Sequence, residues 1–262
     1  MRGRITSIGI IGCGAIGTQL AREIQRRFSR VARLTGIYDN NPQKSQLLCQ
    51  RLRSAIPVLP PEKLVPECDL LIEAASTQAV PQLLSLVIAH KKSMLVMSTG
   101  GLLLNPALLK RAIRSQIPVY APSGALVGLD GIKAAATEGL RSVTLTTRKP
   151  PRAFTGLGCL KRPQLLFQGS AGKAVTAFPQ NINVAATLAL AGLGPARTRV
   201  RLIADPAVRE NIHEVEAVGS FGRLFSRTEN RPSAENPKTS RLASQSAVVT
   251  LRQILQPFKV GT

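Results

Sequence analysis

The stretch Ile8-Gly9-Ile10-Ile11-Gly12-Cys13-Gly14-Ala15-Ile16-Gly17 predicts the fold of the first half of this chain. It joins an apolar run to an amphipathic segment through glycines spaced G-x-G-x-x-G. In a strand–turn–helix, such glycines permit the tight turn, the approach of a pyrophosphate to the backbone and the close packing of helix on strand. The pattern therefore predicts a dinucleotide-binding turn. The residues expected to contact the dinucleotide are Gly12, Gly14, Ala15, Ile16 and Gly17.

An acidic residue follows this turn at the distance that the motif requires. Asp39 ends the second apolar run, in Ile37-Tyr38-Asp39-Asn40, about twenty residues after Gly17. A carboxylate there accepts hydrogen bonds from the adenosine ribose hydroxyls and repels a 2′-phosphate, which favours NAD. Lys44 is close enough in sequence to keep NADP open as an alternative.

The first 122 residues alternate strand and helix signals. Apolar runs that read as buried strands lie at 5–11, 34–38, 70–74, 94–97 and 119–121, and helical stretches lie at 16–28, 42–52, 78–90 and 106–114. This rhythm predicts βαβ units and a parallel sheet. We therefore expect residues 1–122 to form an N-terminal Rossmann domain.

The order of the expected strands and helices changes after residue 122. Strands are expected at 143–147, 198–203, 211–218 and 221–226, helices at 124–139, 185–190 and 240–255, and loops at 149–152 and 228–237. Because this half lacks a βαβ rhythm, residues 123–239 are expected to form an α+β catalytic and dimerisation domain. Residues 240–262 are expected to be a C-terminal helix that can pack back on the first domain. The fold class is thus α/β, with a parallel-sheet Rossmann domain followed by an α+β domain.

The composition describes a folded globular protein. Hydrophobic residues make up 44% of the 262 residues. No apolar run approaches the roughly 20 residues needed to span a bilayer. The first strand begins by Ile5, which leaves no room for a signal peptide before it. We expect a cytoplasmic protein without membrane attachment. The four cysteines are scattered and form no C-x-x-C pair, so we expect neither a disulfide framework nor a metal site.

The net charge of +21 raises the question of a polyanionic partner. No acidic residue occurs between Glu138 and Asp205, so the excess reflects missing acids and not a Lys/Arg-rich tail. Nucleic-acid binding is therefore not expected as the main function. A positive field that attracts a small dianionic substrate and a general basic drift in composition both remain open.

Two histidines are available for proton transfer. His90 follows a hydrophobic helix beside Lys91 and Lys92, which indicates a partner for the helix C-terminus. His213 lies in a predicted strand before Glu214. The residues alone leave a structural and a catalytic role for His213 equally open.

Four loop-like segments of the second half carry polar groups suited to chemistry. They are Ser123-Gly124-Ala125, residues 178–184 (Phe-Pro-Gln-Asn-Ile-Asn-Val), Asn211-Ile212-His213 and residues 236–240 (Asn-Pro-Lys-Thr-Ser). With the glycine turn, Gly-Ser-Ala at 169–171 and Gly-x-Phe-Gly at 219–222, they make the chain resemble the L-aspartate dehydrogenase family. The resemblance runs nearly end to end.

This resemblance implies NAD(P)-dependent oxidative deamination of L-aspartate to iminoaspartate, or the reverse amination of oxaloacetate, which can feed NAD biosynthesis. It implies that His213 is the active-site residue and that Ala125 and Asn183 line the cofactor. A histidine with a pKa near neutrality can take the proton of the substrate ammonium or activate water. The family also leads us to expect a homodimer.

A dicarboxylate substrate needs cationic or N–H donors. The candidates are Asn211, Lys238, Thr239 and Ser240. For Ser240 the role of a plain helix N-cap is favoured over a substrate contact, and for Asn211 a plain strand-end role is an equally good explanation. Two other functions stay open: a related two-domain reductase of another amino or keto dicarboxylate, and a non-catalytic dinucleotide- or polyanion-binding protein.

Overall fold

The computed structural model describes residues 5–154, 156–157, 160–178, 183–231 and 240–261. The chain divides into two compact units. The first unit comprises residues 1–122 and 247–259, and the second comprises residues 123–246 and 260–262.

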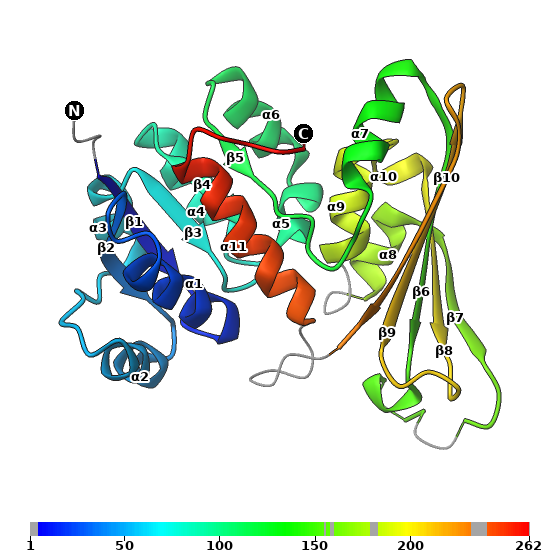
Figure 1. Cartoon of the computed structure of the whole chain (residues 1–262), viewed down its shortest axis with the longest axis horizontal. Coiled ribbons are helices and arrows are strands. Elements are labelled where there is room, and N and C mark those ends of the chain that lie inside the picture. The colour runs from blue at the N-terminus through cyan, green and yellow to red at the C-terminus, as the bar shows by residue number, and fades with distance from the viewer. Residues whose placement is uncertain (1–4, 155, 158–159, 179–182, 232–239, 262) are drawn as a thin grey trace. The chain divides into compact units, whose positions relative to one another are not determined.

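The first unit is built on a parallel sheet. Its elements are β1 (Thr6–Ile11), α1 (Ala15–Arg26), β2 (Ala32–Tyr38), α2 (Pro42–Leu52), α3 (Pro61–Glu67), β3 (Leu70–Glu73), α4 (Val80–Ala89), β4 (Ser93–Val96), α5 (Thr99–Leu104), α6 (Pro106–Arg114) and β5 (Val119–Tyr120). The strand order is β2-β1-β3-β4-β5, and every neighbouring pair is parallel (Figure 1). The predicted Rossmann-type parallel sheet is confirmed. The short helices α3 and α5 were not predicted, because neither is long enough to show a helical period.

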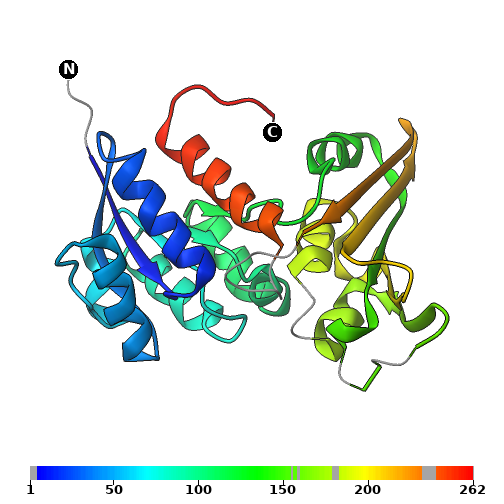
Figure 2. The ribbon, with the colours of Figure 1, turned by 60° about the horizontal axis from the view of Figure 1, so that its bottom comes forward.

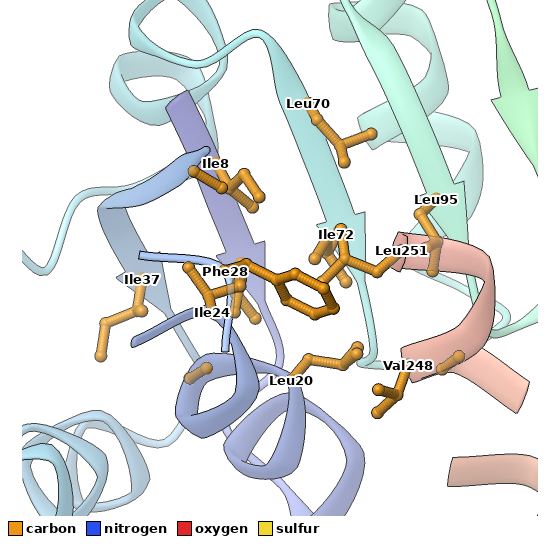
Figure 3. Close-up of a cluster of buried hydrophobic side chains, with 14 of the residues drawn as sticks. Ile8, Leu20, Ile24, Phe28, Ile37, Leu70, Ile72, Leu95, Val248 and Leu251 are labelled. Carbon is orange, nitrogen blue, oxygen red and sulfur yellow. The ribbon is translucent and has the colours of Figure 1, made fainter. Parts of the chain in front are cut away.

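One face of this sheet is covered by α1 and by the later part of α11 (Arg241–Leu255), which lie side by side in Figures 1 and 2. Leu20 and Ile24 of α1 recur every four residues, so they project from one side of that helix onto Ile8 and Ile72 of the sheet. Val248 and Leu251 of α11 join the same aliphatic cluster (Figure 3). The parallel strands are buried on both faces, as their unbroken apolar runs indicated.

The second unit has a mixed sheet. Its elements are α7 (Leu129–Glu138), β6 (Leu140–Lys149), the 3-10 turn η1 (Pro151–Ala153), β7 (Gln164–Ser170), α8 (Ala171–Ala177), α9 (Asn183–Ala191), α10 (Gly194–Arg197), β8 (Thr198–Ala204), β9 (Asn211–Gly219) and β10 (Gly222–Asn230). The strand order is β10-β9-β6-β8-β7, in which β6–β8 is parallel and the other three pairs are antiparallel. Helices α7 to α10 lie on one face (Figure 1).

Three boundaries in this unit differ from the predictions. The expected helix over 124–139 begins only at Leu129, because Gly128 has a positive φ of 81° that no helix accommodates. The expected loop at 228–237 is wrong for residues 228–230, since β10 continues to Asn230 through pairing with β9. The expected turn at 149–152 begins one residue late, because Lys149 still pairs with Ala204 in the sheet. Cross-strand pairing therefore overrides the local turn signals.

Candidate active site

The glycine turn follows β1, the strand at which the strand order of the parallel sheet reverses. Strand β1 lies between β2 and β3, and the chain crosses it on the way from β2 to β3. In open parallel sheets, ligands bind outside the carboxyl ends of the strands at such a switch point. Gly12 follows β1 with a φ of 101°, and a side chain there would collide with the backbone of Ala74 and Ala75 after β3. Glycine is therefore required at this turn for both its conformation and its space.

Gly14 and Gly17 leave the start of α1 open. A side chain at Gly17 would collide with the Gly12 carbonyl, whereas one at Gly14 would meet no atom of the described residues within 4 Å. Gly14 is the N-cap of α1, and it provides no side chain to bind the free N–H groups of the first turn. These N–H groups and the space beside Gly14 suit a pyrophosphate.

Asp39 is attached directly to the glycine turn. Its Oδ2 accepts a hydrogen bond of 2.8 Å from the Cys13 N–H, and its Oδ1 accepts one of 2.9 Å from the Asn41 N–H. Asn41 in turn caps α2 by accepting from the Gln43 N–H. The half-buried carboxylate therefore has a set orientation beside the turn, with further lone pairs for the hydroxyls of a ribose.

Glu73 is a polar residue of this region that the sequence reasoning missed. It ends β3 and is fully buried. Its Oε1 accepts from the Ser98 hydroxyl and the Ala75 N–H, both at 2.8 Å, and its Oε2 accepts from the Ser98 N–H at 2.9 Å. Burial raises the pKa of the Glu73 carboxyl, and these hydrogen bonds oppose the rise. Glu73 thus links the loops after β3 and β4; its only sequence signal was an acid at the end of an apolar strand.

In the second unit, His213 is buried on β9 and is held by β6. Thr147 lies directly opposite His213 in the β6–β9 register, and its Oγ1 is 3.0 Å from Nδ1 of the imidazole. Burial, and after it the charge of Lys149, lowers the pKa of His213 from 6.5 to about 3. The near-neutral pKa expected from the sequence therefore does not hold for this structure, because the low-dielectric surroundings disfavour the imidazolium.

Lys149 lies on the same sheet face as Thr147, two residues further along β6. Its side chain is buried, and burial lowers the pKa of its ammonium from 10.5 to about 8. The sequence predicts a turn at this position and gives no functional role to Lys149. The signal that could have found it is a lysine that continues the buried alternation of Leu145 and Thr147.

A small apolar cavity lies between this sheet face and the helices. Thr147 is its polar member, and its hydroxyl also contacts the imidazole. The lining residues are Leu145, Thr147, Phe167, Ala174, Phe178, Ala185, Val200 and Leu202. The cavity shows that the imidazole partner Thr147 faces the helix-covered side of the sheet.

Ala125 is brought to the strand of His213 by β10. Its carbonyl oxygen accepts hydrogen bonds from Thr228 Oγ1 at 3.1 Å and from Asn230 Nδ2 at 3.3 Å. Thr228 lies directly opposite His213 in the β9–β10 register. Thr228 therefore links Ala125 to the strand of His213, although all three lie far apart in the sequence.

The remaining predicted positions differ in what the structure says of them. Asn183 is the exposed first residue of α9, and the half-buried Asn211 begins β9 on the same face as His213. Ser240 is buried and its Oγ accepts a hydrogen bond of 3.1 Å from the Ala243 N–H, so Ser240 is the N-cap of α11. Lys238 and Thr239 lie outside the described residues.

Comparison with known proteins finds a matching family model for each half of the chain. Residues 130–254 match the family model "Aspartate dehydrogenase, C-terminal", and residues 12–122 match "Homoserine dehydrogenase, NAD binding domain". The L-aspartate dehydrogenases of Methanosarcina mazei and Methanosarcina barkeri are 43% and 42% identical to this chain, over 97% of its length and 99% of theirs. This chain belongs to the L-aspartate dehydrogenase family.

A solved structure of an aspartate dehydrogenase has the same fold as this chain. The crystal structure of aspartate dehydrogenase from Thermotoga maritima superposes with a TM-score of 0.75 at 27% identity, covering 98% of this chain and 99% of that one. The resemblance inferred from the glycine turn and the loop segments is thereby confirmed. Within the described residues, no helix is long and apolar enough to cross a membrane.

Proposed function

We propose that this protein is an NAD-dependent L-aspartate dehydrogenase. It converts L-aspartate to iminoaspartate and, in reverse, aminates oxaloacetate. The observation that supports this most directly is the nearly full-length identity of more than 40% to L-aspartate dehydrogenases. The buried cluster of His213, Thr147 and Lys149 supplies groups suited to the chemistry.

NAD, when bound, supplies the acceptor for the hydride that leaves Cα of the substrate. We assign its pyrophosphate to the turn of Gly12, Gly14 and Gly17 and to the open N-terminus of α1. Asp39 binds the adenosine ribose and disfavours a 2′-phosphate, so NAD is preferred over NADP. Ala15 and Ile16 belong to the same turn. Ala125 and Asn183 are assigned to the cofactor as well, on the strength of the family motif.

His213 is the proposed catalytic base. Because Thr147 engages Nδ1, the nitrogen left for the substrate is Nε2. A neutral imidazole can accept the proton that the substrate ammonium must lose before hydride transfer. The low pKa of the free enzyme ensures that this imidazole is unprotonated, and the two carboxylates of a bound substrate would raise that pKa and make the base stronger.

The substrate is proposed to be a dicarboxylate held by donors near His213. Asn211 lies two residues away on the same strand face and is assigned to this role, together with Lys238 and Thr239. The Oγ of Ser240 already caps α11. Ser240 is therefore assigned to the substrate only through its backbone N–H, or through a hydroxyl that contacts the substrate and the helix end together.

We infer a homodimer that forms through the sheet face opposite the helices of the second unit. This face carries the ion pairs Arg227–Glu214 and Arg223–Glu216 and the exposed Phe225. A two-fold axis would let such a face pair with itself. Light scattering after gel filtration distinguishes a dimer from a monomer. We also place the enzyme in the cytoplasm, where its iminoaspartate could supply NAD biosynthesis.

The deciding experiment follows NAD reduction with purified protein and a panel of amino acids. L-Aspartate is expected to be the preferred substrate, with little turnover of L-glutamate or L-alanine. Turnover of another amino or keto dicarboxylate without turnover of L-aspartate would instead favour the related reductase. Salt-sensitive binding of RNA or DNA without any turnover would favour a polyanion-binding protein.

A further inference from the structure

Glu73 lies between two elements at the edge of the sheet where NAD is proposed to bind. In the strand register it is opposite Ile11, the last residue before the glycine turn, and opposite Val96 at the end of β4. Its side chain is on the same sheet face as Leu71, which packs against α4. Because the carboxylate is fully buried, it can act on a ligand only through the backbone that it holds.

The carboxylate of Glu73 joins the loops that follow β3 and β4. Oε1 accepts hydrogen bonds from the Ala75 N–H and the Ser98 hydroxyl at 2.8 Å, and Oε2 accepts one from the Ser98 N–H at 2.9 Å. Each oxygen thus faces a backbone N–H, which can only donate. A carboxylate meets this requirement at both oxygens. An amide does not, because one of its ends would place N–H groups against a backbone donor.

The loop that Glu73 holds borders the glycine turn. The backbone of Ala74 and Ala75 approaches Gly12 so closely that a side chain at Gly12 would collide with it. On the other side, a side chain at Gly101 of α5 would collide with the Thr77 carbonyl. Residues 74–77 are therefore packed between the glycine turn and α5, with Ala75 exposed. A displacement of this loop would change the shape of the turn.

We propose that Glu73 is a positioning residue of the NAD site, which sets the affinity for the dinucleotide by holding Ala74 and Ala75 against the glycine turn. This inference rests on the position of NAD proposed above. Ligands of parallel sheets bind at the carboxyl edge, where this loop is exposed. Without the carboxylate the loop would gain freedom in the free protein, and ordering it again on binding would cost affinity.

The opposite end of β3 provides a matched contact. Asp69 directly precedes β3, and its Oδ2 accepts hydrogen bonds from the Ser7 N–H at 2.9 Å and from the Ser7 hydroxyl at 2.7 Å. At each end of the strand, an acidic side chain therefore accepts from the N–H and the hydroxyl of one serine. The contact of Asp69 lies at the amino edge of the sheet, away from the glycine turn. Its loss should affect stability without affecting the NAD site.

The test compares Glu73→Gln with Asp69→Asn, and Ser98→Ala with Ser7→Ala. Each purified protein is titrated with NADH, and binding is followed by the fluorescence of the nicotinamide. Glu73→Gln is expected to raise the Kd for NADH about 10-fold or more, and Ser98→Ala, which loses one hydrogen bond, about 3-fold. Asp69→Asn and Ser7→Ala should bind NADH like the wild type, although their melting temperatures fall. An unchanged Kd in Glu73→Gln, or an equal rise in Asp69→Asn, would overturn the proposal.

Steady-state kinetics provide a second readout that a general loss of stability would not change. The KM for NAD, measured at saturating L-aspartate, should rise in Glu73→Gln in parallel with the Kd for NADH. The KM for L-aspartate, measured at saturating NAD, should stay within about two-fold of the wild type. An equal rise of both KM values would contradict the assignment, because the effect would then not be confined to the cofactor.

The two levels of inference fail in different ways. If the wild type does not bind NADH, the proposed cofactor position falls, and the role of Glu73 with it. If the wild type binds NADH without oxidising L-aspartate, the proposed activity falls, and the Kd values still decide the role of Glu73. If the wild type is active and the variants at Glu73 and Ser98 keep its Kd, only the role of Glu73 falls.

Folding of each variant is verified by circular dichroism. Should Glu73→Gln not fold, the comparison of Ser98→Ala with Ser7→Ala decides, because each removes one hydroxyl and leaves the backbone N–H of its serine in place. A higher Kd for NADH in Ser98→Ala alone supports the proposal. Equal Kd values in the two serine variants overturn it.

Discussion

Thr147 Oγ1 lies 3.0 Å from Nδ1 of His213, and the two residues are 66 positions apart in the sequence. The contact follows from the β6–β9 register, which places them directly opposite each other. A hydroxyl at Nδ1 fixes the orientation of the ring and determines which nitrogen remains for the substrate. The geometry of the proposed base is therefore set by its partner strand.

Removing this hydroxyl should reduce turnover while leaving substrate affinity nearly unchanged. Thr147→Val keeps the shape of the side chain but frees the imidazole, and we expect kcat to fall about 10-fold or more, as for other orienting partners of functional histidines. Thr147→Ser retains the hydroxyl and serves as the control, with kcat close to the wild type. Equal kcat values in the Val and Ser variants would show that the contact has no catalytic effect.

Removal of the imidazole itself should have a larger effect. His213→Ala is expected to lower kcat by a factor of about 100 or more, since general base catalysis commonly contributes that much. His90→Ala, at the C-terminus of α4 in the other unit, is the matched control and should retain full activity. Substantial turnover by His213→Ala would remove the catalytic assignment.

The buried imidazole should also make stability depend on pH. In the unfolded chain the imidazole takes up a proton near pH 6.5, whereas the folded protein resists protonation down to about pH 3. The unfolded state thus binds more protons between these values, and stability falls as pH falls. For this group the loss between pH 7 and pH 5 is about 2 kcal/mol. Urea unfolding at both pH values should show this difference, and His213→Gln should lack it.

Two glycines of the turn should respond in opposite ways to alanine. Gly14→Ala meets no described atom within 4 Å, so the apo protein should melt at the wild-type temperature. Its methyl group would occupy the space assigned to the pyrophosphate, and the KM for NAD should rise about 10-fold. Gly12→Ala combines a positive φ with a backbone collision and should be destabilised by about 2 kcal/mol or more. Normal NAD affinity in Gly14→Ala would argue against this cofactor position.

The cofactor preference should depend on Asp39. Asp39→Ser removes the charge that repels a 2′-phosphate, so the ratio of kcat/KM for NADP to that for NAD should rise about 10-fold or more. The exposed Lys44 on the first turn of α2 provides the opposite change, and Lys44→Ala should lower NADP use. An unaltered ratio in Asp39→Ser would mean that this carboxylate does not contact the ribose.

The parallel sheet and the glycine turn can be predicted from the amino-acid sequence alone. Both depend on short-range physics: apolar runs of strand length, helical spacing of Leu20 and Ile24, and a backbone conformation that only glycine adopts at Gly12. Motifs of the second half were also sufficient to recognise the family and to select His213. These signals lie within a few residues of each other and need no knowledge of distant contacts.

The surroundings of His213 become visible only in the folded structure. Thr147, Lys149 and Thr228 have no distinguishing pattern in the sequence. The pairing of β6 with β9 brings Thr147 and Lys149 to the strand of His213, and the pairing of β10 with β9 brings Thr228 opposite His213. The low pKa of His213 likewise arises from burial and from a charge on another strand, neither of which a local pattern encodes. Strand register acts between residues far apart in the chain, and for that reason the candidate base was visible in the sequence while its environment was not.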